Sequence, residues 1–512
     1  MPTERTVASL LSELGGAELA QGDPWANIGA VEHDSRRVER GGLFVAIPGF
    51  SVDGHAFLPN VVAAGVGAVI VQKDHADAWR SLPPGSTVIA VGDTRKALAT
   101  ASAWFYDHPG REMVVVGITG TDGKTTTSHM LTNVLEAAGA KVGRLGTVDV
   151  HIPGEADGSL GRMTTPEANE VQRLMRRMAD AGCEYAIVES TSHGLALNRL
   201  DHVEYDIAAF TNVTGDHLDF HKTFEAYRDA KGQLFSALDW AFEKGVPKAA
   251  VVNDDDPSAS YMASRSKAET IRYGLESRDA DLLGRNVILR ADGSDFRLVG
   301  RHGTAEVSIQ IPALFNVANA LAAAGVGLAA GLDLQTIAHG LGTCPGVPGR
   351  MERIDAGQPF TVIVDYAHTG DAVRKVLEVL RAVCVGRLIV VVGAAGERDP
   401  GRRFGVGRAA ALGADFAIFT NEDPRSEDPG EIVREIGRHA EGAGKVRGTD
   451  FVEIEDRREA IAHAVQMVQP DDVLVILGKG HEQSMIHGTT AIPWDDRVVT
   501  REELGRLGFA RG

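Results

Sequence analysis

Short apolar runs alternate with helical patterns along the whole chain, and this alternation restricts the fold more than any other feature of the sequence. Runs such as Leu43–Ile47, Val114–Ile118, Tyr185–Val188, Leu388–Val392 and Val473–Leu477 are almost wholly apolar. Strands of this kind are buried on both faces, as happens in parallel sheets covered by helices. The sequence therefore predicts an α/β protein with mostly parallel sheets.

The length predicts about three domains for this chain of 512 residues. One boundary is expected at His108-Pro109-Gly110, just before a new strand. A second is expected within Gly342–Gly349, where prolines and glycines break any regular element. The predicted domains, all α/β, are 1–110, 111–344 and 345–512.

Charge, cysteine content and hydropathy exclude several classes of protein. The formal net charge of −18 argues against a face that coats nucleic acid or an anionic membrane. Cys183, Cys344 and Cys384 are far apart and odd in number, which favours free thiols in a reducing cytoplasm. The N-terminus lacks a signal-peptide pattern, and the Ala/Gly-rich run 320–332 is too short to span a bilayer and predicts a packed helix. We expect a cytoplasmic monomer without nucleic-acid partners or membrane insertion.

A glycine-rich segment joins a predicted strand, Met113–Thr119, to a predicted helix, Lys124–Ala138. Glycines let backbone N–H groups close around phosphate oxygens, and the helix N-terminus adds positive potential. Lys124 would reach the β- and γ-phosphates of ATP, and the Thr125 hydroxyl suits Mg²⁺. Ile118 stands where the general phosphate-loop pattern has a glycine, so only its second half is matched. The predicted nucleotide-binding residues are Gly120, Thr121, Asp122, Gly123, Lys124, Thr125 and Thr126.

Two further predicted strands end in side chains that suit a metal ion. Glu189 follows Tyr185–Val188, and the run Asp206–Phe210 leads into a segment that contains His217. Such side chains at the carboxyl ends of strands point into the crevice where ligands of open α/β sheets bind. Each group alone could be a hydrogen-bonded loop residue, but their order after a phosphate loop favours a metal site.

With these motifs in this order, the sequence resembles the Mur ligases, the ATP-dependent amide-forming family of peptidoglycan synthesis, over essentially its whole length. The resemblance implies an N-terminal UDP-substrate domain, a central phosphate-loop ATPase domain and a C-terminal Rossmann-like domain for the amino acid. It also implies that Lys231, in Tyr227-Arg-Asp-Ala-Lys231, is carbamylated by CO₂ and becomes an anionic ligand for a second Mg²⁺. By itself, Lys231 would be taken for an exposed helical lysine. The implied metal ligands are Thr125, Glu189, His217 and Lys231.

Other family motifs follow along the chain. Asn316 and Asn319 lie in a segment that resembles the adenine-side motif, although Ala313 stands where the family usually has glycine. Arg350, in Pro348-Gly-Arg350, resembles the entry to the C-terminal domain and would lie near the nucleotide. Asp365-Tyr366-Ala-His368 resembles the motif that closes over ATP, although Gly370 replaces a common proline. The catalytic residues implied are Lys124, Glu189, His217, Lys231 and His368.

The resemblance also implies where the two ends of the substrate bind. Ser35 would lie near the uracil, and Thr164-Thr165-Pro166 would contact the muramoyl peptide. Arg398 would hold the α-carboxylate of the incoming amino acid, and Glu482 with an acidic partner would hold its distal ammonium group. The substrate-binding residues implied are Ser35, Thr164, Thr165, Ser192, Arg199, Arg398, Glu422, Asp423, Arg425, Gly478 and Glu482.

The segment Glu422-Asp423-Pro424-Arg425 leaves the amino acid open. Family members that add meso-diaminopimelate usually carry Asp-Asn-Pro-Arg here, and lysine-adding members commonly carry Asp-Asp-Pro-Ala. Arg425 could pair with the second carboxylate of diaminopimelate. Asp423 would repel that carboxylate and could neutralise Arg425, which favours lysine or ornithine. A purely structural pair between Arg425 and Asp423 is a further alternative.

The activity implied is the ligation of a diamino acid to UDP-N-acetylmuramoyl-L-alanyl-D-glutamate. ATP would phosphorylate the D-glutamyl carboxylate, Lys124 and two Mg²⁺ ions would spread the charge, and the amine would attack the acyl phosphate. Closure of the C-terminal domain would exclude water. Another ligase of the superfamily, of the folylpolyglutamate or cyanophycin type, is disfavoured by Asp34-Ser35-Arg36 and by Thr164–Pro166. A nucleotide-dependent switch would have no use for Arg398 and the 478–482 segment.

Overall fold

The structure is a computed structural model that describes residues 4–50, 52–155, 165–215, 218–301, 303–397 and 401–509. The chain divides into two compact units. One unit consists of Met1–Leu283 with Leu321–Ile337, and the other consists of Gly284–Ala320 with Ala338–Gly512.

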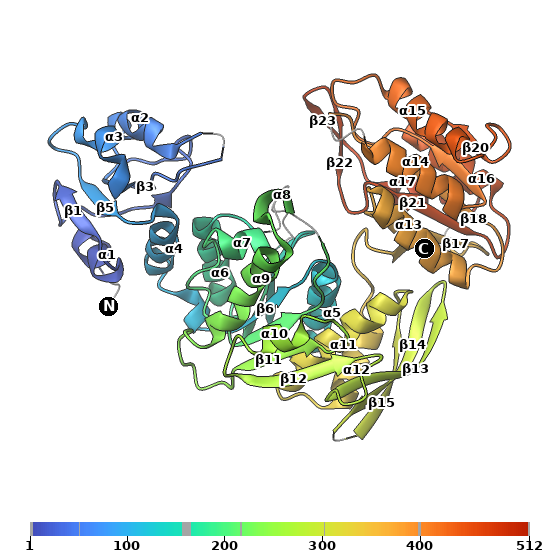
Figure 1. The fold of residues 1–512 in the computed structure, drawn as a ribbon, viewed down its shortest axis with the longest axis horizontal. Helices are drawn as coiled ribbons and strands as arrows, with labels where there is room; N and C mark the ends of the chain where they lie inside the picture. The colour runs from blue at the N-terminus through green and yellow to red at the C-terminus, as the bar shows by residue number, and fades with distance from the viewer. Residues whose placement is uncertain are drawn as a thin grey trace. The chain divides into compact units, whose positions relative to one another are not determined.

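The first unit begins with a five-stranded sheet in the order β1-β5-β4-β3-β2, in which all neighbours are parallel except β1 and β5 (Figure 1). Strands β3 and β5 are wholly buried, and β4 is buried except for its last residue, because their side chains are apolar on both faces. The elements here are α1 (Val7–Glu13), β1 (Glu18–Gln21), β2 (Val31–Glu32), β3 (Leu43–Val45), η1 (Gly54–Phe57), α2 (Leu58–Ala63), β4 (Ala68–Gln72), η2 (Lys73–His75), α3 (Ala76–Arg80), β5 (Val88–Val91), α4 (Thr94–Phe105) and η3 (Pro109–Arg111).

The second sheet of this unit runs in the order β12-β11-β10-β6-β9-β7-β8, and all neighbours are parallel except β7 and β8. Its elements are β6 (Val114–Thr119), α5 (Lys124–Ala137), β7 (Val142–Leu145), β8 (Val150–His151), α6 (Ala168–Asp180), β9 (Tyr185–Glu189), α7 (Ser192–Ala196), β10 (Ile207–Phe210), α8 (Leu218–His221), α9 (Phe224–Leu238), β11 (Ala249–Asn253), α10 (Ala259–Ala263) and β12 (Glu269–Gly274).

Helices cover both faces of this second sheet. Val115 of β6 shares one core with Met175 of α6 and Leu234 of α9. On the other face, the end of helix α11 (Leu314–Ala329) approaches β11 and α5, since Gly325 abuts Val251 and Gly327 lies close to the side chain of Val134. The carboxyl ends of β6, β9 and β10 meet at one edge, where Ile118 pairs with Glu189 and Thr119 with Phe210.

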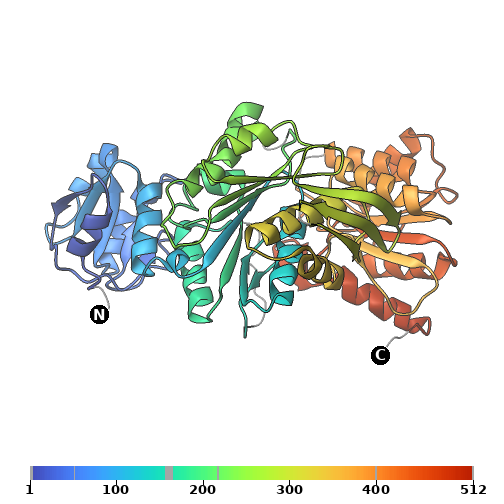
Figure 2. The ribbon, with the colours of Figure 1, turned by 90° about the horizontal axis from the view of Figure 1, so that it is seen from below.

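The second unit contains the antiparallel hairpin of β14 and β15, the first turns of α11 and a six-stranded sheet in the order β16-β17-β21-β18-β19-β20. Only β16 is antiparallel to its neighbour in that sheet. Helices α16 and α17 share one core beneath it, and α13, α14 and α15 pack on the opposite face (Figure 2). The remaining elements are β13 (Leu282–Arg290), β14 (Gly293–Gly300), β15 (Gly303–Ile309), α12 (Leu334–Thr343), β16 (Glu352–Arg353), β17 (Thr361–Asp365), α13 (Gly370–Val383), β18 (Leu388–Val392), α14 (Gly401–Gly413), β19 (Phe416–Phe419), α15 (Pro429–Gly442), β20 (Phe451–Glu453), α16 (Arg457–Met467), β21 (Val473–Leu477), β22 (Ser484–His487), β23 (Thr490–Pro493) and α17 (Asp496–Arg506).

These elements confirm the α/β fold with mostly parallel sheets. The helix predicted at Lys124–Ala138 ends one residue early, and the helix predicted over 320–332 starts earlier and ends at Ala329. The three cysteines are free thiols. In the part of the chain that the structure describes, no helix has the length and apolarity needed to cross a bilayer. The two domain boundaries stay predictions.

Candidate active site

The predicted phosphate loop joins the end of β6 to the start of α5. Lys124 folds back over the loop, and its Nζ donates to the carbonyl oxygens of Gly120 (3.0 Å) and Thr121 (2.9 Å). A Cβ at Gly120 would lie 1.8 Å from Thr211 Oγ1, so a side chain at this position would clash. The first turn of α5 supplies backbone N–H groups without partners inside the helix, and such groups bind phosphate oxygens.

The segment after β10 holds this loop in shape. The backbone N–H of Thr121 donates to Asn212 O (2.8 Å), and the N–H of Asp122 donates to Asn212 Oδ1 (3.0 Å). Thr211 Oγ1 donates to Asp122 O (2.6 Å). Because β6 and β10 are neighbours, these contacts join two adjacent strand ends. The loop is thus braced by the protein itself, although the sequence reasoning gave Thr211 and Asn212 no such role.

Glu189 ends β9 and is 1% exposed. One of its oxygens accepts from Thr125 Oγ1 (3.0 Å) and Thr147 Oγ1 (2.9 Å). The other accepts from Ser128 Oγ (3.3 Å) and the N–H of Thr147 (3.2 Å). The Thr125 hydroxyl and the carboxylate together form a set of oxygen donors that fits Mg²⁺. The predicted ligand His217 lies outside the described residues.

Thr147 and Ser128 were missed by the sequence reasoning. Thr147 follows β7, which pairs with β9, so its place after a strand adjacent to the Glu189 strand is the signal that could have found it. Ser128 lies one helical turn after Lys124, on α5. Both side chains act on Glu189 and hold its carboxylate in one orientation.

Lys231 lies in the middle of α9 and is 1% exposed. Its Nζ donates to Gly120 O (2.6 Å) and lies 4.4 Å from the centre of the Tyr227 ring. Tyr227 OH in turn lies 3.1 Å from Thr121 Oγ1. The alternative that Lys231 is an ordinary exposed lysine is therefore wrong, because the side chain is buried against the phosphate loop.

Three of the residues predicted to bind the muramoyl peptide lie together beside Glu189. Thr165 Oγ1 donates to Glu189 O (3.2 Å), and Arg199 donates to Thr165 O (3.2 Å). Ser192 begins α7 and is buried. Arg199 also forms an ion pair with Glu167 (2.5 Å), a residue that the sequence reasoning missed. Thr164 lies outside the described residues.

Ser35 lies in a turn directly after β2. Asp34 shapes this turn, because its carboxylate accepts from the backbone N–H of Arg36 (3.0 Å) and pairs with the Arg36 guanidinium (2.6 Å). The hydrogen bonds from Arg36 lower the pKa of Asp34 to about 2. The turn therefore keeps its charge pair at neutral pH and presents Ser35 at the carboxyl edge of the N-terminal sheet.

Asp53, His55 and His75 form a cluster at the same edge. The backbone N–H of Gln72 donates to His55 Nε2 (3.0 Å), so the ring proton of a neutral His55 is on Nδ1, which contacts Asp53 Oδ1 (2.7 Å). This tautomer leaves neither ring nitrogen with a free lone pair for a metal ion. His75 bridges Asp53 (3.0 Å) and Asp74 (2.7 Å). The cluster is thus a hydrogen-bond chain that fixes the turn after β3.

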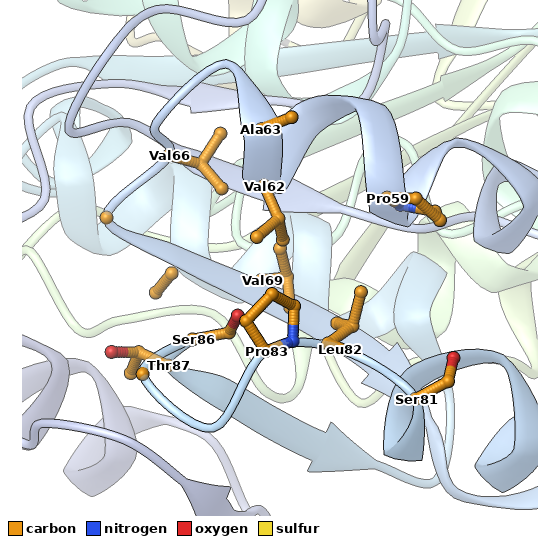
Figure 3. Close-up of a pocket in the computed structure, with 13 residues that line it drawn as sticks. Pro59, Val62, Ala63, Val66, Val69, Ser81, Leu82, Pro83, Ser86 and Thr87 are labelled. Atoms are coloured by element: carbon orange, nitrogen blue, oxygen red, sulfur yellow. The ribbon is translucent and has the colours of Figure 1, made fainter.

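A cavity of about 500 Å³ lies elsewhere in the N-terminal sheet region, between α2, β4 and the segment that precedes β5 (Figure 3). Its walls are mainly apolar and include Val62, Val66, Val69 and Leu82. It shares no residue with the predicted site, and no charged side chain among the described residues lines it, so it offers no counter-charge for a nucleotide or a charged peptide. We assign the chemistry to the strand ends and not to this cavity.

The residues predicted for the adenine side lie in the second unit, at the start of α11. Asn316 Nδ2 donates to Pro312 O (2.7 Å), and Asn319 Nδ2 donates to Asn316 Oδ1 (3.1 Å). Both asparagines are buried. Ala313, which replaces the usual glycine, has φ 92°, so the departure from the family pattern falls on a backbone conformation that favours glycine.

Asp365 ends β17 and ties two segments of the second unit together. Its carboxylate accepts from the backbone N–H groups of Met351 (2.7 Å) and Ala367 (2.8 Å), and burial raises its pKa. The Met351 contact fixes the segment that carries Arg350.

Arg350 and His368 both contact Tyr366. The Arg350 guanidinium lies 4.6 Å from the ring centre of Tyr366. His368 Nδ1 lies 2.9 Å from Tyr366 O, and burial lowers the pKa of His368. His368 is therefore a neutral imidazole at neutral pH.

The residues predicted to bind the incoming amino acid lie together in the segments that follow β19 and β21. Lys479, directly after Gly478, is fully buried, and its Nζ donates to Asp423 Oδ1 (2.8 Å) and Glu482 Oε2 (2.6 Å). Asp423 Oδ1 also accepts from the N–H of Ile486 (3.0 Å). The alternative of a structural Arg425–Asp423 pair is therefore wrong, since the partner of Asp423 is Lys479. Arg398 lies outside the described residues.

Glu422 and Arg425 are constrained differently. Burial raises the pKa of Glu422 to about 7, and its Oε2 has no hydrogen-bond partner among the described residues. Arg425 has φ 55°, an uncommon backbone conformation for a residue with a side chain. Its backbone is held by β22, through N–H donation to Ile486 O (3.0 Å) and acceptance from the N–H of Gly488 (2.7 Å). Within the described residues, the Arg425 Nε has no hydrogen-bond partner.

Three family models match this chain in succession. They are the Mur ligase family catalytic domain over residues 27–106, the Mur ligase middle domain over 118–327 and the Mur ligase glutamate ligase domain over 349–480. The three matched ranges include most of the predicted site residues described above.

Whole-chain relatives agree with the domain matches. The UDP-N-acetylmuramyl-tripeptide synthetase of Roseiflexus sp. (strain RS-1) is 45% identical, over 94% of this chain and 95% of its own. The UDP-N-acetylmuramoyl-L-alanyl-D-glutamate--2,6-diaminopimelate ligase of Geobacillus kaustophilus is 40% identical, over 98% and 99%. A solved structure of a UDP-N-acetylmuramoyl-L-alanyl-D-glutamate--2,6-diaminopimelate ligase is similar with a TM-score of 0.71 and 28% identity, over 98% of this chain and 99% of that one.

Proposed function

Because this chain belongs to the Mur ligase family and is an ATP-dependent ligase, we propose that it joins meso-diaminopimelate to the D-glutamyl carboxylate of UDP-N-acetylmuramoyl-L-alanyl-D-glutamate. Relatives with high coverage bear names for this dipeptide substrate and this amino acid. The product would be a tripeptide precursor of peptidoglycan.

The observation that carries the choice of diaminopimelate is the pairing of Asp423 with Lys479. The charge of Asp423 is compensated inside the protein, so the sequence argument that Asp423 would repel a second carboxylate loses its force. The Arg425 Nε keeps its hydrogen-bonding capacity. A guanidinium nitrogen that has no hydrogen-bond partner among the described residues suits a carboxylate ligand.

The ATP phosphates would bind Lys124 and the backbone N–H groups at the start of α5. Thr125 and Glu189 would hold Mg²⁺, and Lys231, once carbamylated by CO₂, would add anionic oxygens for a second ion. Mg²⁺ supplies neutralisation of the charge that develops on the transferred phosphoryl group. Support for Lys231 comes from its burial and from its 2.6 Å contact with the phosphate loop.

Other residues would orient the UDP-linked peptide, the nucleotide and the incoming amino acid. Thr165, Ser192 and Arg199 would position the muramoyl peptide, and Ser35 would contact the uracil. Asn316 and Asn319 would serve the adenine side, Arg350 would lie near the nucleotide, and Asp365 and His368 would belong to the segment that closes over ATP. Arg398, Glu422, Gly478 and Glu482 would receive the amino acid.

In this scheme, the D-glutamyl carboxylate attacks the γ-phosphorus of ATP and releases ADP. The amine of diaminopimelate then attacks the acyl phosphate, loses a proton and releases phosphate, which leaves an amide. Both steps must exclude water, because the acyl phosphate hydrolyses otherwise.

An assay of ADP release tests the proposal. The wild-type protein is given ATP, Mg²⁺ and the UDP-linked dipeptide with meso-diaminopimelate, lysine or ornithine, and the product is identified by mass spectrometry. We expect ADP release that needs both substrates and is fastest with diaminopimelate. A faster reaction with lysine or ornithine contradicts the choice of amino acid, and ADP release without the dipeptide contradicts the ligation.

A further inference from the structure

Lys479 contacts no substrate in the scheme above, although it pairs with Asp423 and is one of the most deeply buried charged groups of the second unit. Among the described residues, the carboxylates that act on it are those of Asp423, Glu482 and Glu422. A second buried cation, Arg457, also lowers the pKa of Glu422, but its guanidinium is engaged by Asp496 (2.7 Å) and by the carbonyl oxygens of Asn421 and Leu477. Lys479 is therefore the ammonium group that compensates this set of carboxylates.

Among the described residues, the charges of the pocket balance when Lys479 is included. Asp423 and Glu482 carry negative charge, and Lys479 and Arg425 carry positive charge, so these four cancel. Glu422 adds a partial negative charge near pH 7, because burial raises its pKa to about 7. The far end of diaminopimelate carries an ammonium and a carboxylate, whereas the far end of lysine carries the ammonium alone. A balanced pocket suits the first, and a pocket with surplus negative charge suits the second.

Lys479 also reaches Arg425 through a chain of contacts. It fixes Asp423, whose Oδ1 accepts from the N–H of Ile486 on β22. Ile486 O accepts from the N–H of Arg425 and holds that residue at φ 55°. On the other side, Glu482 is held between Lys479 and Tyr366 OH (3.5 Å). One ammonium group thus orients both predicted contacts for the distal end of the amino acid.

We propose that Lys479 is a positioning residue that determines amino-acid specificity: it cancels the charge of Asp423 and orients Arg425 and Glu482, and so makes the pocket accept a second carboxylate. This inference rests on the proposed diaminopimelate ligation. It assigns the preference for diaminopimelate to an internal lysine in addition to the arginine that would contact the substrate.

Lys479→Met keeps the length of the side chain and removes the charge. With the UDP-linked dipeptide and ATP saturating, we expect kcat/KM for diaminopimelate to fall by about tenfold to a hundredfold, mainly through KM, since a carboxylate ligand then meets uncompensated carboxylates. With lysine we expect kcat/KM to be unchanged or higher, because surplus negative charge suits a lone ammonium group, so the ratio of the two kcat/KM values falls by about tenfold or more. The KM for ATP should not change. Lys375→Met, an exposed lysine on α13, is the matched control.

Two further variants keep the test decisive if Lys479→Met folds poorly. Lys479→Met with Asp423→Asn restores the charge balance and should recover most of the preference for diaminopimelate. Asp423→Asn alone leaves the Lys479 charge in surplus and should raise the ratio of diaminopimelate to lysine above the wild-type value. Circular dichroism confirms folding of each variant before kinetics.

A parallel loss with both amino acids in Lys479→Met, with the ratio unchanged, means that Lys479 is only structural and overturns the inference. An unchanged or lower ratio in Asp423→Asn overturns it as well. In either case a wild-type enzyme that prefers diaminopimelate leaves the proposed function intact. A wild-type enzyme that uses neither amino acid contradicts the proposed function itself, and the inference with it.

Discussion

The phosphate-loop centre and the amino-acid pocket are built from different kinds of contact. Around Glu189, the neighbours that orient the carboxylate are hydroxyl and backbone groups, from Thr125, Ser128 and Thr147. Around Lys479, the neighbours are carboxylates whose charges oppose its own. The first region depends on hydrogen-bond geometry, and the second depends on charge balance. Substitutions and pH should therefore affect the two regions in different ways.

The largest effect is expected at the phosphate loop. Lys124→Ala removes the cation that would meet the β- and γ-phosphates, and we expect the rate of phosphate release to fall by about a thousandfold or more. The matched control is Lys141→Ala, an exposed lysine of the same unit, which should behave like the wild type. Phosphate release by Lys124→Ala at a normal rate would contradict the proposed role of this loop in binding the ATP phosphates. Binding of amino acid to the second unit should be unaltered.

Arg425→Ala tests the charge-dependent region. We expect the KM for diaminopimelate to rise by about a hundredfold, because a charged hydrogen bond to the second carboxylate is lost. The KM for lysine should change by less than about threefold, since lysine has no such carboxylate. Steady-state kinetics with both amino acids measures this, with the exposed Arg434→Ala on α15 as control. Equal losses with the two amino acids would show that Arg425 does not read the second carboxylate.

The hydrogen-bond region is tested by Thr147. Thr147→Val keeps the shape and removes the hydroxyl that donates to Glu189 at 2.9 Å. We expect kcat to fall by about tenfold and the Mg²⁺ concentration for half-maximal rate to rise, because outer ligands of this kind orient the metal ligand. Thr147→Ser keeps the hydroxyl and should restore most of the rate. Thr147→Ser as impaired as Thr147→Val would mean that packing and not the hydrogen bond matters.

The sequence predicted more of the phosphate-loop centre than of the amino-acid pocket. The strand β6, the loop and α5 are consecutive, so their apolar and glycine pattern predicted them almost to the residue. The burial of Lys231 against Gly120, 111 residues away, could be inferred only from resemblance to a family. Lys479 and Asp423 are 56 residues apart, and no local pattern shows which of several nearby charges pair. The charge argument about Asp423 was incomplete for this reason, because it omitted the counter-ion.

Glu422 makes the amino-acid pocket sensitive to pH. Its pKa rises from 4.5 to about 7 in the folded protein because burial disfavours the carboxylate. Between these two values the folded state holds more protons than the unfolded state, so stability falls as pH rises through this window. Glu422→Gln lacks this loss. Relative to the wild type it should gain about 1 to 3 kcal/mol between about pH 5 and about pH 8.

Denaturant unfolding followed at several pH values measures this difference. Glu459→Gln, an exposed substitution on α16, is the control and should not show the same trend. A stability difference between Glu422→Gln and the wild type that is constant with pH would show that Glu422 stays ionised, which would make the pocket more negative than the charge balance described above.

The smallest effect concerns the backbone before α11. Ala313 has φ 92° and is 1% exposed. A left-handed backbone is less stable for an L-residue by about 1 kcal/mol or more. Ala313→Gly should therefore stabilise the protein by about 0.5 to 1 kcal/mol, because relief of strain at this backbone exceeds the added freedom of the unfolded chain. Ala322→Gly, in the interior of the same helix, should have the opposite sign, because glycine weakens a helix. If both substitutions destabilise the protein, the conformation at Ala313 carries no strain, and the departure from the family glycine has no cost. If only Ala322→Gly destabilises the protein, Ala313 is a strained residue. The structure at the start of α11, which carries Asn316, then holds Ala313 in place, as β22 holds Arg425.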